Sequence, residues 1–296
     1  MIHNLAKSVL IIVSILLLQL LQLLIYVLFL NPVIGTWGAS KSETSMPMAG
    51  DDPALMVTST RAILINAPQH IVWRGLMQLG ADRSGFYSYE FLENALGYKT
   101  RYPDLTTPQF KDLKVGDIVR GSIDEKSSLI PYNFRVLYIK PEDTFVLQNW
   151  GTFLLNNVNS QQTRLIIRTQ EAKNSNSVIR FAHYIFVPFH FIMERRTLIG
   201  IKVWAETGKN VSFSQSKDIL WFANIIVSWL LICFLVFIGR GFIQSVIIPV
   251  ALSISWLLVV LLLNPIILYS AALLLISCFA ILGIVRMGKI KHNGSF

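Results

Sequence analysis

Hydrophobic residues are concentrated in four long stretches that contain no charged side chain. These stretches run Val9–Leu30, Ile219–Ile238, Phe242–Leu263 and Ile266–Val285. A transmembrane helix needs about 20 mostly apolar residues, so each stretch is long enough to cross a bilayer. The pattern therefore predicts an N-terminal transmembrane anchor with its linker at residues 1–40, a domain at 41–218, and a three-helix membrane region with a basic tail at 219–296.

Shorter apolar patterns between the first two spans predict a domain of mixed secondary structure. Val57–Ile65 alternates and is rich in β-branched residues, which is typical of a strand. Pro68–Leu79 and Ser88–Leu96 carry the start and end signals of short helices. A long helix is predicted from near Pro188 to about Glu206, because proline suits the first turn of a helix.

Short strand-like runs separated by turn residues lie between these helices. They are Asp117–Ser122, Asn133–Lys140, Thr144–Trp150, Thr152–Asn157 and Thr163–Glu171. Their spacing predicts an antiparallel meander. The whole order predicts the α+β class, with a curved antiparallel sheet, two short helices, and a long C-terminal helix that covers the concave face. Residues 41–56 are polar and rich in small residues, and they predict a linker on the membrane surface.

The charge distribution indicates how the chain is oriented. The formal net charge is +9, yet every acidic residue lies between Glu43 and Asp218. The basic residues outside 41–218 flank the spans on one predicted side, and they are Lys7, Arg240, Arg286, Lys289 and Lys291. The positive-inside bias assigns that side to the cytoplasm. We therefore predict an integral protein of the cell membrane with four spans, cytoplasmic termini and an extracytoplasmic domain. No nucleic-acid partner is expected, because the domain lacks a concentrated basic patch.

The long predicted helix contains an arginine in the middle of an apolar sector. At about 100° per residue, Arg196 falls among Phe189 and Met193 on the helical wheel. A guanidinium cannot lose its charge, so its burial requires a carboxylate or several acceptors. One interpretation, which we favour, is a structural ion pair with Glu93 or Glu90. The other is that Arg196 points into a cavity and binds an acidic ligand group such as a carboxylate or a lipid phosphate.

A second group of candidate residues precedes the second short helix. Arg83, Tyr87 and Tyr89 lie in a Gly-rich, aromatic string. Tyrosine combines an apolar body with a polar tip, which suits the mouth of a cavity. The alternative, which we favour, is that this string packs the start of the helix onto the sheet.

Several motifs in the domain resemble the SRPBCC superfamily, the START-related, polyketide-cyclase-like proteins with a helix-grip fold. The matching residues are Ala67-Pro68, Val72-Trp73, Gln78-Leu79-Gly80 with Arg83, Gly85-Phe86-Tyr87-Ser88-Tyr89, Leu92-Glu93-Asn94 with Gly97, Leu113-Lys114-Val115-Gly116-Asp117, Gly151-Thr152-Phe153, Thr163-Arg164-Leu165, Met193-Glu194-Arg195-Arg196 and Gly200-Ile201-Lys202. The likeness covers roughly residues 43–206 and is greatest to a membrane-associated, uncharacterised branch. It implies a cavity between the long helix and the sheet that takes apolar ligands.

Other chemistry is poorly supported by the sequence. His190 and Glu194 are four residues apart on the predicted helix, but no third metal ligand is placed near them. The sequence has no G-x-S-x-G elbow and no phosphate-binding glycine loop, and the domain has no cysteine. We therefore predict no catalytic residue, no metal site and no cofactor.

These observations favour a membrane-anchored binding protein that holds a lipid or other hydrophobic small molecule. The expected ligand-binding residues are Arg196, Met193, Phe189, Tyr87, Tyr89, Arg83 and Glu93. The expected partners are the lipid bilayer and that small molecule. Two alternatives stay open: a cyclase- or hydrolase-like enzyme that uses Glu93 and Glu194 in the same cavity, and a non-catalytic assembly or sensory protein whose spans contact a membrane protein partner.

Overall fold

The computed structural model describes residues 2–100, 111–124, 133–172, 176–208 and 215–293. The chain forms two compact units. We call Pro32–Gln215 the sheet unit, and Met1–Asn31 together with Ser216–Phe296 the apolar-helix unit.

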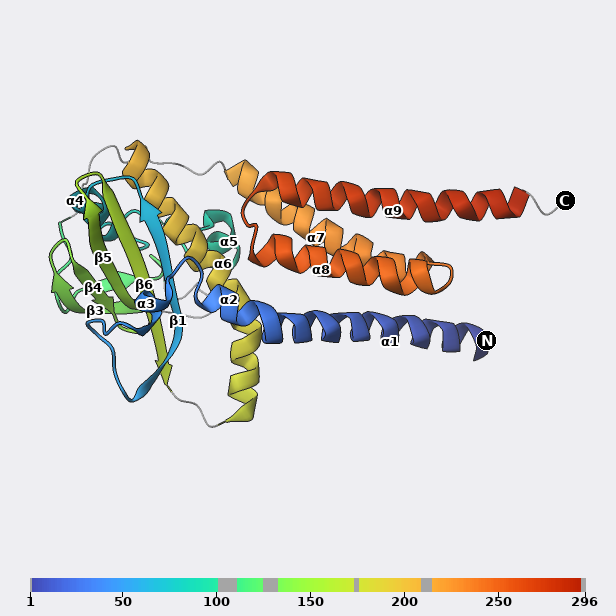
Figure 1. The fold of residues 1–296 in the computed structure, drawn as a ribbon, viewed down its shortest axis with the longest axis horizontal. Helices are drawn as coiled ribbons and strands as arrows, with labels where there is room; N and C mark the ends of the chain where they lie inside the picture. The colour runs from blue at the N-terminus through green and yellow to red at the C-terminus, as the bar shows by residue number, and fades with distance from the viewer. Residues whose placement is uncertain (1, 101–110, 125–132, 173–175, 209–214, 294–296) are drawn as a thin grey trace. The chain divides into compact units, whose positions relative to one another are not determined.

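The apolar-helix unit is built from long helices (Figure 1). They are α1 (Ile2–Ile25), α7 (Gln215–Ile238), α8 (Ile248–Leu261) and α9 (Ile267–Asn293). Four helical stretches in the described residues are long and apolar enough to cross a membrane, and they run Val9–Gly35, Ser216–Ile238, Ile243–Leu261 and Ile267–Met287. This finding agrees with the four stretches predicted from the sequence and fits a membrane protein.

Hydrogen bonds between polar side chains link helices inside this unit. The amide Nδ2 of Asn224 on α7 donates to the Ser270 hydroxyl on α9 at 3.2 Å. The indole Nε1 of Trp229 on α7 donates to Gln19 Oε1 on α1 at 3.3 Å. Between apolar helices, hydrogen bonds of this kind help to fix which faces meet.

The sheet unit contains one six-stranded antiparallel sheet with the order β1-β6-β5-β4-β3-β2. The strands are β1 (Leu55–Ile65), β2 (Ile118–Arg120), β3 (Asn133–Lys140), β4 (Thr144–Leu147), β5 (Gly151–Asn159) and β6 (Gln162–Ala172). The α+β class and the antiparallel meander predicted from the sequence are confirmed. The predicted strand Thr144–Trp150 is shorter in the structure, because a turn with a positive φ at Asn149 follows Leu147.

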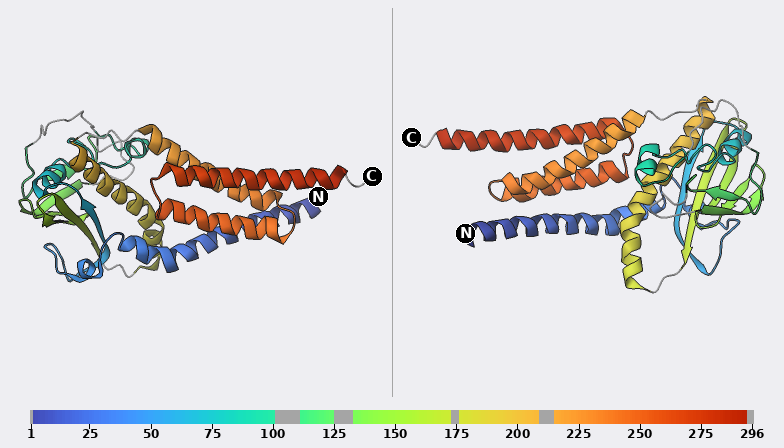
Figure 2. Two further views of the ribbon diagram at one scale, coloured as in Figure 1. Left: turned by 45° about the horizontal axis from the view of Figure 1, so that its top comes forward. Right: turned by 180° about the vertical axis from the view of Figure 1, so that it is seen from behind.

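The two faces of the sheet differ because successive residues of a strand point to opposite sides. Ile65 of β1 and Leu165 and Ile167 of β6 belong to the main core. That core also includes side chains of the short helix α4 (Gln69–Leu76) and of the long helix α6 (Ser177–Thr207), which crosses this face (Figures 1 and 2).

Helix α6 is longer than the sequence analysis predicted. It begins at Ser177, so Pro188 lies inside the helix and not in its first turn. His183, which precedes Pro188, is therefore part of the same helix. The prediction of a helix start near Pro188 was wrong, because proline suits a first turn but is tolerated inside a helix where the missing N–H and the kink are accommodated. The short helix α5 (Glu90–Ala95) lies within the predicted range Ser88–Leu96.

The opposite face of the sheet is covered by a segment that we call the strap (residues 39–54). It contains helix α3 (Lys41–Ser45), whose start is closed by a reciprocal capping box between Ser40 and Glu43. Met48 of the strap packs against Ala62 and Ile166 of the sheet. The prediction that residues 41–56 form a linker was wrong, because this segment packs against the sheet through both apolar and charged contacts.

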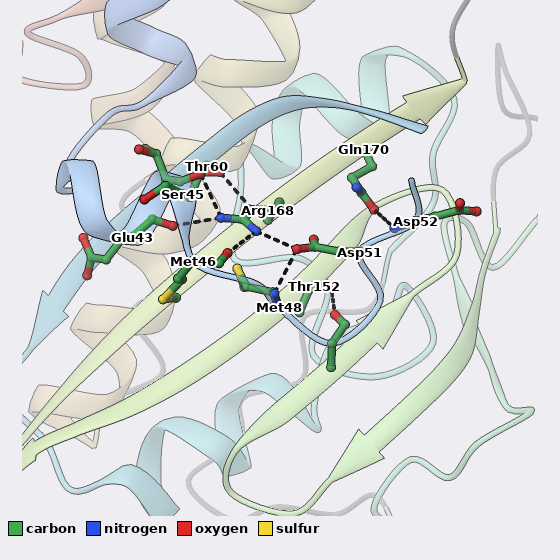
Figure 3. A network of polar contacts seen from close by, with 12 residues as sticks. Glu43, Ser45, Met46, Met48, Asp51, Asp52, Thr60, Thr152, Arg168 and Gln170 are labelled. Atoms are coloured by element: carbon green, nitrogen blue, oxygen red, sulfur yellow. Dashed lines mark hydrogen bonds and ion pairs between the residues drawn. The ribbon is translucent and has the colours of Figure 1, made fainter. Parts of the chain in front are cut away.

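Two arginines of β6 fasten the strap to the sheet. Arg168 donates to the backbone oxygens of Glu43 at 2.8 Å and of Met46 at 2.7 Å, and it pairs with the Asp51 carboxylate at 2.8 Å (Figure 3). Arg164 pairs with the Glu43 carboxylate at 2.7 Å. Two acidic residues of the strap, Glu43 and Asp51, thus have arginine partners on this face of the sheet.

Candidate functional site

A cavity of about 380 Å³ lies in the sheet unit beside helix α6. Its walls come from α6, from α5 and the segments on either side of α5, from β3, and from the turn between β4 and β5. The volume falls within the range of about 300–1,000 Å³ that small-molecule sites occupy. The cavity is therefore large enough to be a binding site.

Most of the wall surface is apolar. Phe86, Phe134 and Trp150 form an aromatic group, with ring centroids 6.2 Å apart for Phe86–Phe134, 5.7 Å for Phe86–Trp150 and 4.9 Å for Phe134–Trp150. The other apolar lining residues are Leu96, Tyr98 and Met193. Rings that contact one another in this way form a rigid wall.

The polar side chains of the lining differ in their exposure. Glu93 and Glu194 are each only 2% exposed, so their carboxylates belong to the inner part of the cavity. Leu96 is 40% exposed, and the side chain of His190 is 49% exposed, so these residues mark the mouth. The remaining polar lining residues are Ser88, Asn149 and Thr197.

Glu194 is held by a buried ion pair across two elements. Its Oε1 lies 2.7 Å from Nη1 of Arg61, and the two side chains are 1% and 2% exposed. Arg61 projects from β1 toward α6, donates from Nε to the Ile34 carbonyl at 2.8 Å, and stacks over the Phe191 ring at 5.0 Å. The guanidinium is thus satisfied by a carboxylate, a backbone oxygen and an aromatic face, as a buried cation requires.

This surrounding sets the charge of Glu194. Burial raises the pKa of the carboxyl, but the electrostatic interactions with Arg61 and His190 and the hydrogen bond from Arg61 outweigh burial, so the pKa lies below its ordinary value. Glu194 is therefore a carboxylate at neutral pH. Its second oxygen, Oε2, is 3.7 Å from His190 Nε2, which is too long for a hydrogen bond.

Two of the residues predicted to bind a ligand line the cavity, namely Met193 on α6 and Glu93 on α5. Phe189 is 63% exposed and does not line it. The helical wheel grouped Phe189 with Met193 because both lie on one side of α6. However, α6 extends beyond the region that the rest of the sheet unit covers.

Tyr87 and Arg83 contact core residues and backbone oxygens of the sheet unit. The Tyr87 hydroxyl donates to the Gly75 carbonyl at 3.3 Å, and its ring packs against Trp204 in the main core. Burial raises the pKa of Tyr87 well above its ordinary value. Arg83 donates to the carbonyl oxygens of Met77 and Lys111. These contacts agree with the packing interpretation of this string.

Arg196 and Tyr89 are buried together outside the residues that line the cavity. Arg196 is 1% exposed and Tyr89 is fully buried. The Arg196 guanidinium carbon lies 5.4 Å from the centre of the Tyr89 ring, which is cation–π geometry. A direct contact between Arg196 and a ligand stays a prediction.

Sequence reasoning did not predict Arg61, which pairs with Glu194, or several lining residues, Trp150 among them. A signal for Arg61 was present, because Arg61 shares one face of a strand with the apolar residues Ile63 and Ile65. A charge at such a position indicates a buried partner. No comparable signal marked Trp150, which reaches the cavity through the turn at Asn149.

The described residues contain no group of three or more His, Cys, Asp or Glu side chains that could hold a metal ion. The pair His190 and Glu194, four residues apart on α6, is joined by the 3.7 Å contact given above.

Comparisons with known proteins give no family for this chain. No family model and no curated protein matches it. Among solved structures, the protein SSP2350 of Staphylococcus saprophyticus matches with a TM-score of 0.30 and 11% identity, over 52% of this chain and 94% of its own. A conserved protein of unknown function from Enterococcus faecalis, EF2215, matches with a TM-score of 0.31 and 13% identity, over 62% and 91% of the two chains.

Proposed function

We propose that this chain is a membrane-anchored binding protein whose sheet unit holds a lipid or another hydrophobic small molecule. The cavity beside α6 is the observation that carries the proposal, because it is of ligand size and its wall is mostly apolar. A long helix set against a curved antiparallel sheet, with a cavity between them, is the arrangement that the helix-grip resemblance implies. We include membership of that superfamily in the proposal.

The four apolar helices support the same function by location. A binding unit carried on the same chain as membrane spans stays near the bilayer, where molecules dissolved in the membrane are concentrated. The bilayer is then both the anchor and the source of the ligand. The excess of basic residues around the spans supports cytoplasmic termini and an extracytoplasmic sheet unit.

Photo-crosslinking tests the proposal on the full chain in phosphatidylcholine nanodiscs. The probe is decanol with a diazirine on its chain, and the labelled peptides are mapped by mass spectrometry. We expect labelling of peptides that contain cavity residues such as Phe86 or Met193. Labelling confined to the apolar helices would contradict the proposal.

A matched pair of variants sharpens this experiment. Leu96→Trp fills the mouth of the cavity, whereas Leu64→Trp makes the same change on β1, away from the cavity lining, at a site of similar exposure (40% and 38%). Cavity labelling should be lost in Leu96→Trp and kept in Leu64→Trp. Equal labelling of the two variants would mean that the probe does not enter through this mouth.

An acid–base enzyme is the second candidate, and the two carboxylates that share the cavity favour it. Glu93 and Glu194 both line the space, in which a substrate would also lie. The ion pair with Arg61 keeps Glu194 deprotonated, so this residue would serve as a base. Turnover of a bound molecule that is lost in Glu93→Gln would establish this function in place of simple binding.

A further inference from the structure

Two polar atoms at the cavity have no hydrogen-bond partner among the described residues. They are Oε2 of Glu194 and Nε1 of Trp150. Both residues line the cavity, and both are more than nine-tenths buried, with Trp150 7% and Glu194 2% exposed. Oε2 lies 3.7 Å from His190 Nε2, which is too long for a hydrogen bond. Buried polar groups in folded proteins are almost always hydrogen-bonded, so these two atoms leave a place in the cavity for a group that bonds to both.

The two atoms have opposite requirements and lie near each other. Oε2 is a carboxylate oxygen and needs a donor, whereas the indole Nε1 is a donor and needs an acceptor. The indole of Trp150 contributes to the lowered pKa of Glu194, yet the geometry between them does not complete a hydrogen bond. A single group that both donates and accepts would satisfy the pair.

A hydroxyl is such a group, whereas an ester carbonyl, an ether, a carboxylate and an ammonium are not. A carbonyl or an ether oxygen accepts from Trp150 but leaves Glu194 Oε2 without a donor. A carboxylate brings a second negative charge against Glu194. An ammonium donates but has no lone pair for Trp150. The rest of the wall offers apolar contact to a hydrocarbon chain.

We propose that the cavity selects an apolar molecule that carries a hydroxyl, such as a long-chain alcohol, with the hydroxyl donating to Glu194 Oε2 and accepting from Trp150 Nε1. This inference rests on the proposed binding function and adds the chemical class of the ligand. The ion pair with Arg61 then has a role in the site, because it holds Glu194 as a charged acceptor inside an apolar cavity.

Competition against the diazirine-bearing decanol probe tests the inference on the full chain in nanodiscs. Unlabelled decanol, decyl methyl ether and decane are compared at equal mole fractions in the bilayer, so that partition into lipid cancels. We expect decanol to displace the probe from the cavity at about one-tenth of the mole fraction that decane requires, because decane leaves both polar atoms unsatisfied. The ether should be weaker than decanol, since it cannot donate.

Trp150→Phe is the decisive variant because it keeps an aromatic ring and removes only the donor and some volume. The preference for decanol over decane should shrink in Trp150→Phe. It should persist in Trp73→Phe, the same change at a core residue that does not line the cavity. If Trp150→Phe does not fold, the decanol, ether and decane series on the wild-type chain still decides the question.

The outcomes separate this inference from the function on which it rests. Probe labelling of the cavity with equal displacement by decanol and decane would overturn the hydroxyl proposal and leave the binding function standing. That result would also follow if a water molecule satisfied both atoms. A preference that falls equally in Trp73→Phe would overturn the assignment to Trp150. The absence of any cavity labelling would overturn both proposals.

Discussion

The pairing of Arg61 with Glu194 places two opposite charges inside the apolar part of the sheet unit. The residues are 133 positions apart in the sequence, and their contact links β1 to α6. A buried pair of this kind contributes little compared with apolar residues of the same size, but removal of one partner leaves an uncompensated charge. The pair therefore makes the position of α6 on the sheet sensitive to either residue.

Arg61→Met should lower the free energy of unfolding by about 3–5 kcal/mol, because it leaves the Glu194 carboxylate buried without its cation. Urea unfolding of the full chain in detergent measures the change. Lys140→Met is the control. It breaks the exposed Lys140–Asp143 pair, whose side chains are 62% and 36% exposed, and it should cost less than about 0.5 kcal/mol. Equal effects of the two variants would contradict the account of the buried pair.

The contacts of Glu43 predict that the stability of the folded strap depends on pH. The hydrogen bond from Arg164 lowers the pKa of Glu43 from its ordinary value to about 2, against an opposing effect of burial. The Glu43 carboxyl therefore binds a proton less tightly in the folded state than in the unfolded state. The stabilisation that the Glu43 carboxylate gives the folded state is complete above the ordinary pKa of the residue, about 4.5, and is lost as the pH falls toward about 2.

Glu43→Gln should cost about 1–2 kcal/mol at neutral pH, after allowance for partial solvent screening. The difference from the wild type should shrink as the pH falls from about 4.5 to about 2. Urea unfolding at several pH values measures it, with the exposed Glu142→Gln as control. A difference that does not depend on pH would show that the Glu43 charge is not what holds the strap.

At the scale of elements, two prolines are preceded by a widened helical turn. The π-helical turns Tyr26–Leu30 and Ile243–Ile247 each end two residues before a proline, Pro32 and Pro249. In each turn, the residue just before the proline donates its N–H to the carbonyl oxygen five residues earlier. A widened turn keeps the backbone bonded where proline cannot donate and would crowd the preceding turn.

The close pairing of β5 with β6 depends on the glycine that begins β5. A Cβ on Gly151 would lie 2.0 Å from the Arg168 carbonyl oxygen, and its φ is +142°. Gly116 also has a positive φ, +94°, but a Cβ there would meet nothing within 4 Å.

We expect Gly116→Ala to cost about 1–2 kcal/mol through backbone strain alone. Gly151→Ala should cost clearly more, because the carbonyl of Arg168 cannot move without disturbing the ladder and the strap contacts. Hydrogen exchange of the β5 and β6 amides in the full chain measures the local effect. Equal protection in both variants would contradict this prediction.

At the scale of the whole molecule, the predicted orientation can be checked with single cysteines. Cys233 and Cys278, the two native cysteines, are first replaced by alanine. A membrane-impermeant maleimide should then label Asn159→Cys, in the exposed β5–β6 turn, in intact cells. Arg240→Cys, between two spans, should react only after permeabilisation. The reverse pattern would place the sheet unit in the cytoplasm.

Local patterns predicted much of the fold. The four apolar stretches, the strand Asn133–Lys140 and the antiparallel order followed from residue type and spacing over a few positions. The strap was misassigned because its partners, Arg164 and Arg168, lie on a strand more than a hundred residues later. The start of α6 was misplaced because the local rule for Pro188 has an exception inside helices.

The candidate site was less predictable than the fold for the same reason. Met193 was predicted from its place on the helical wheel and Glu93 as a possible partner of Arg196, and both line the cavity. Trp150 and the pairing of Arg61 with Glu194 depend on how separate strands and α6 come together, which no local spacing specifies. Of the polar groups at the cavity, Trp150 and the pair of Arg61 and Glu194 are thus the ones that tertiary packing decides.

Native mass spectrometry of the full chain released from nanodiscs tests the central claim most directly. The account predicts one tightly held apolar molecule per chain that persists after annular lipids are stripped, and that is absent from Leu96→Trp but present in Leu64→Trp. A bare chain in the wild type, or an adduct that Leu96→Trp retains unchanged, would contradict the claim that the cavity beside α6 binds a ligand.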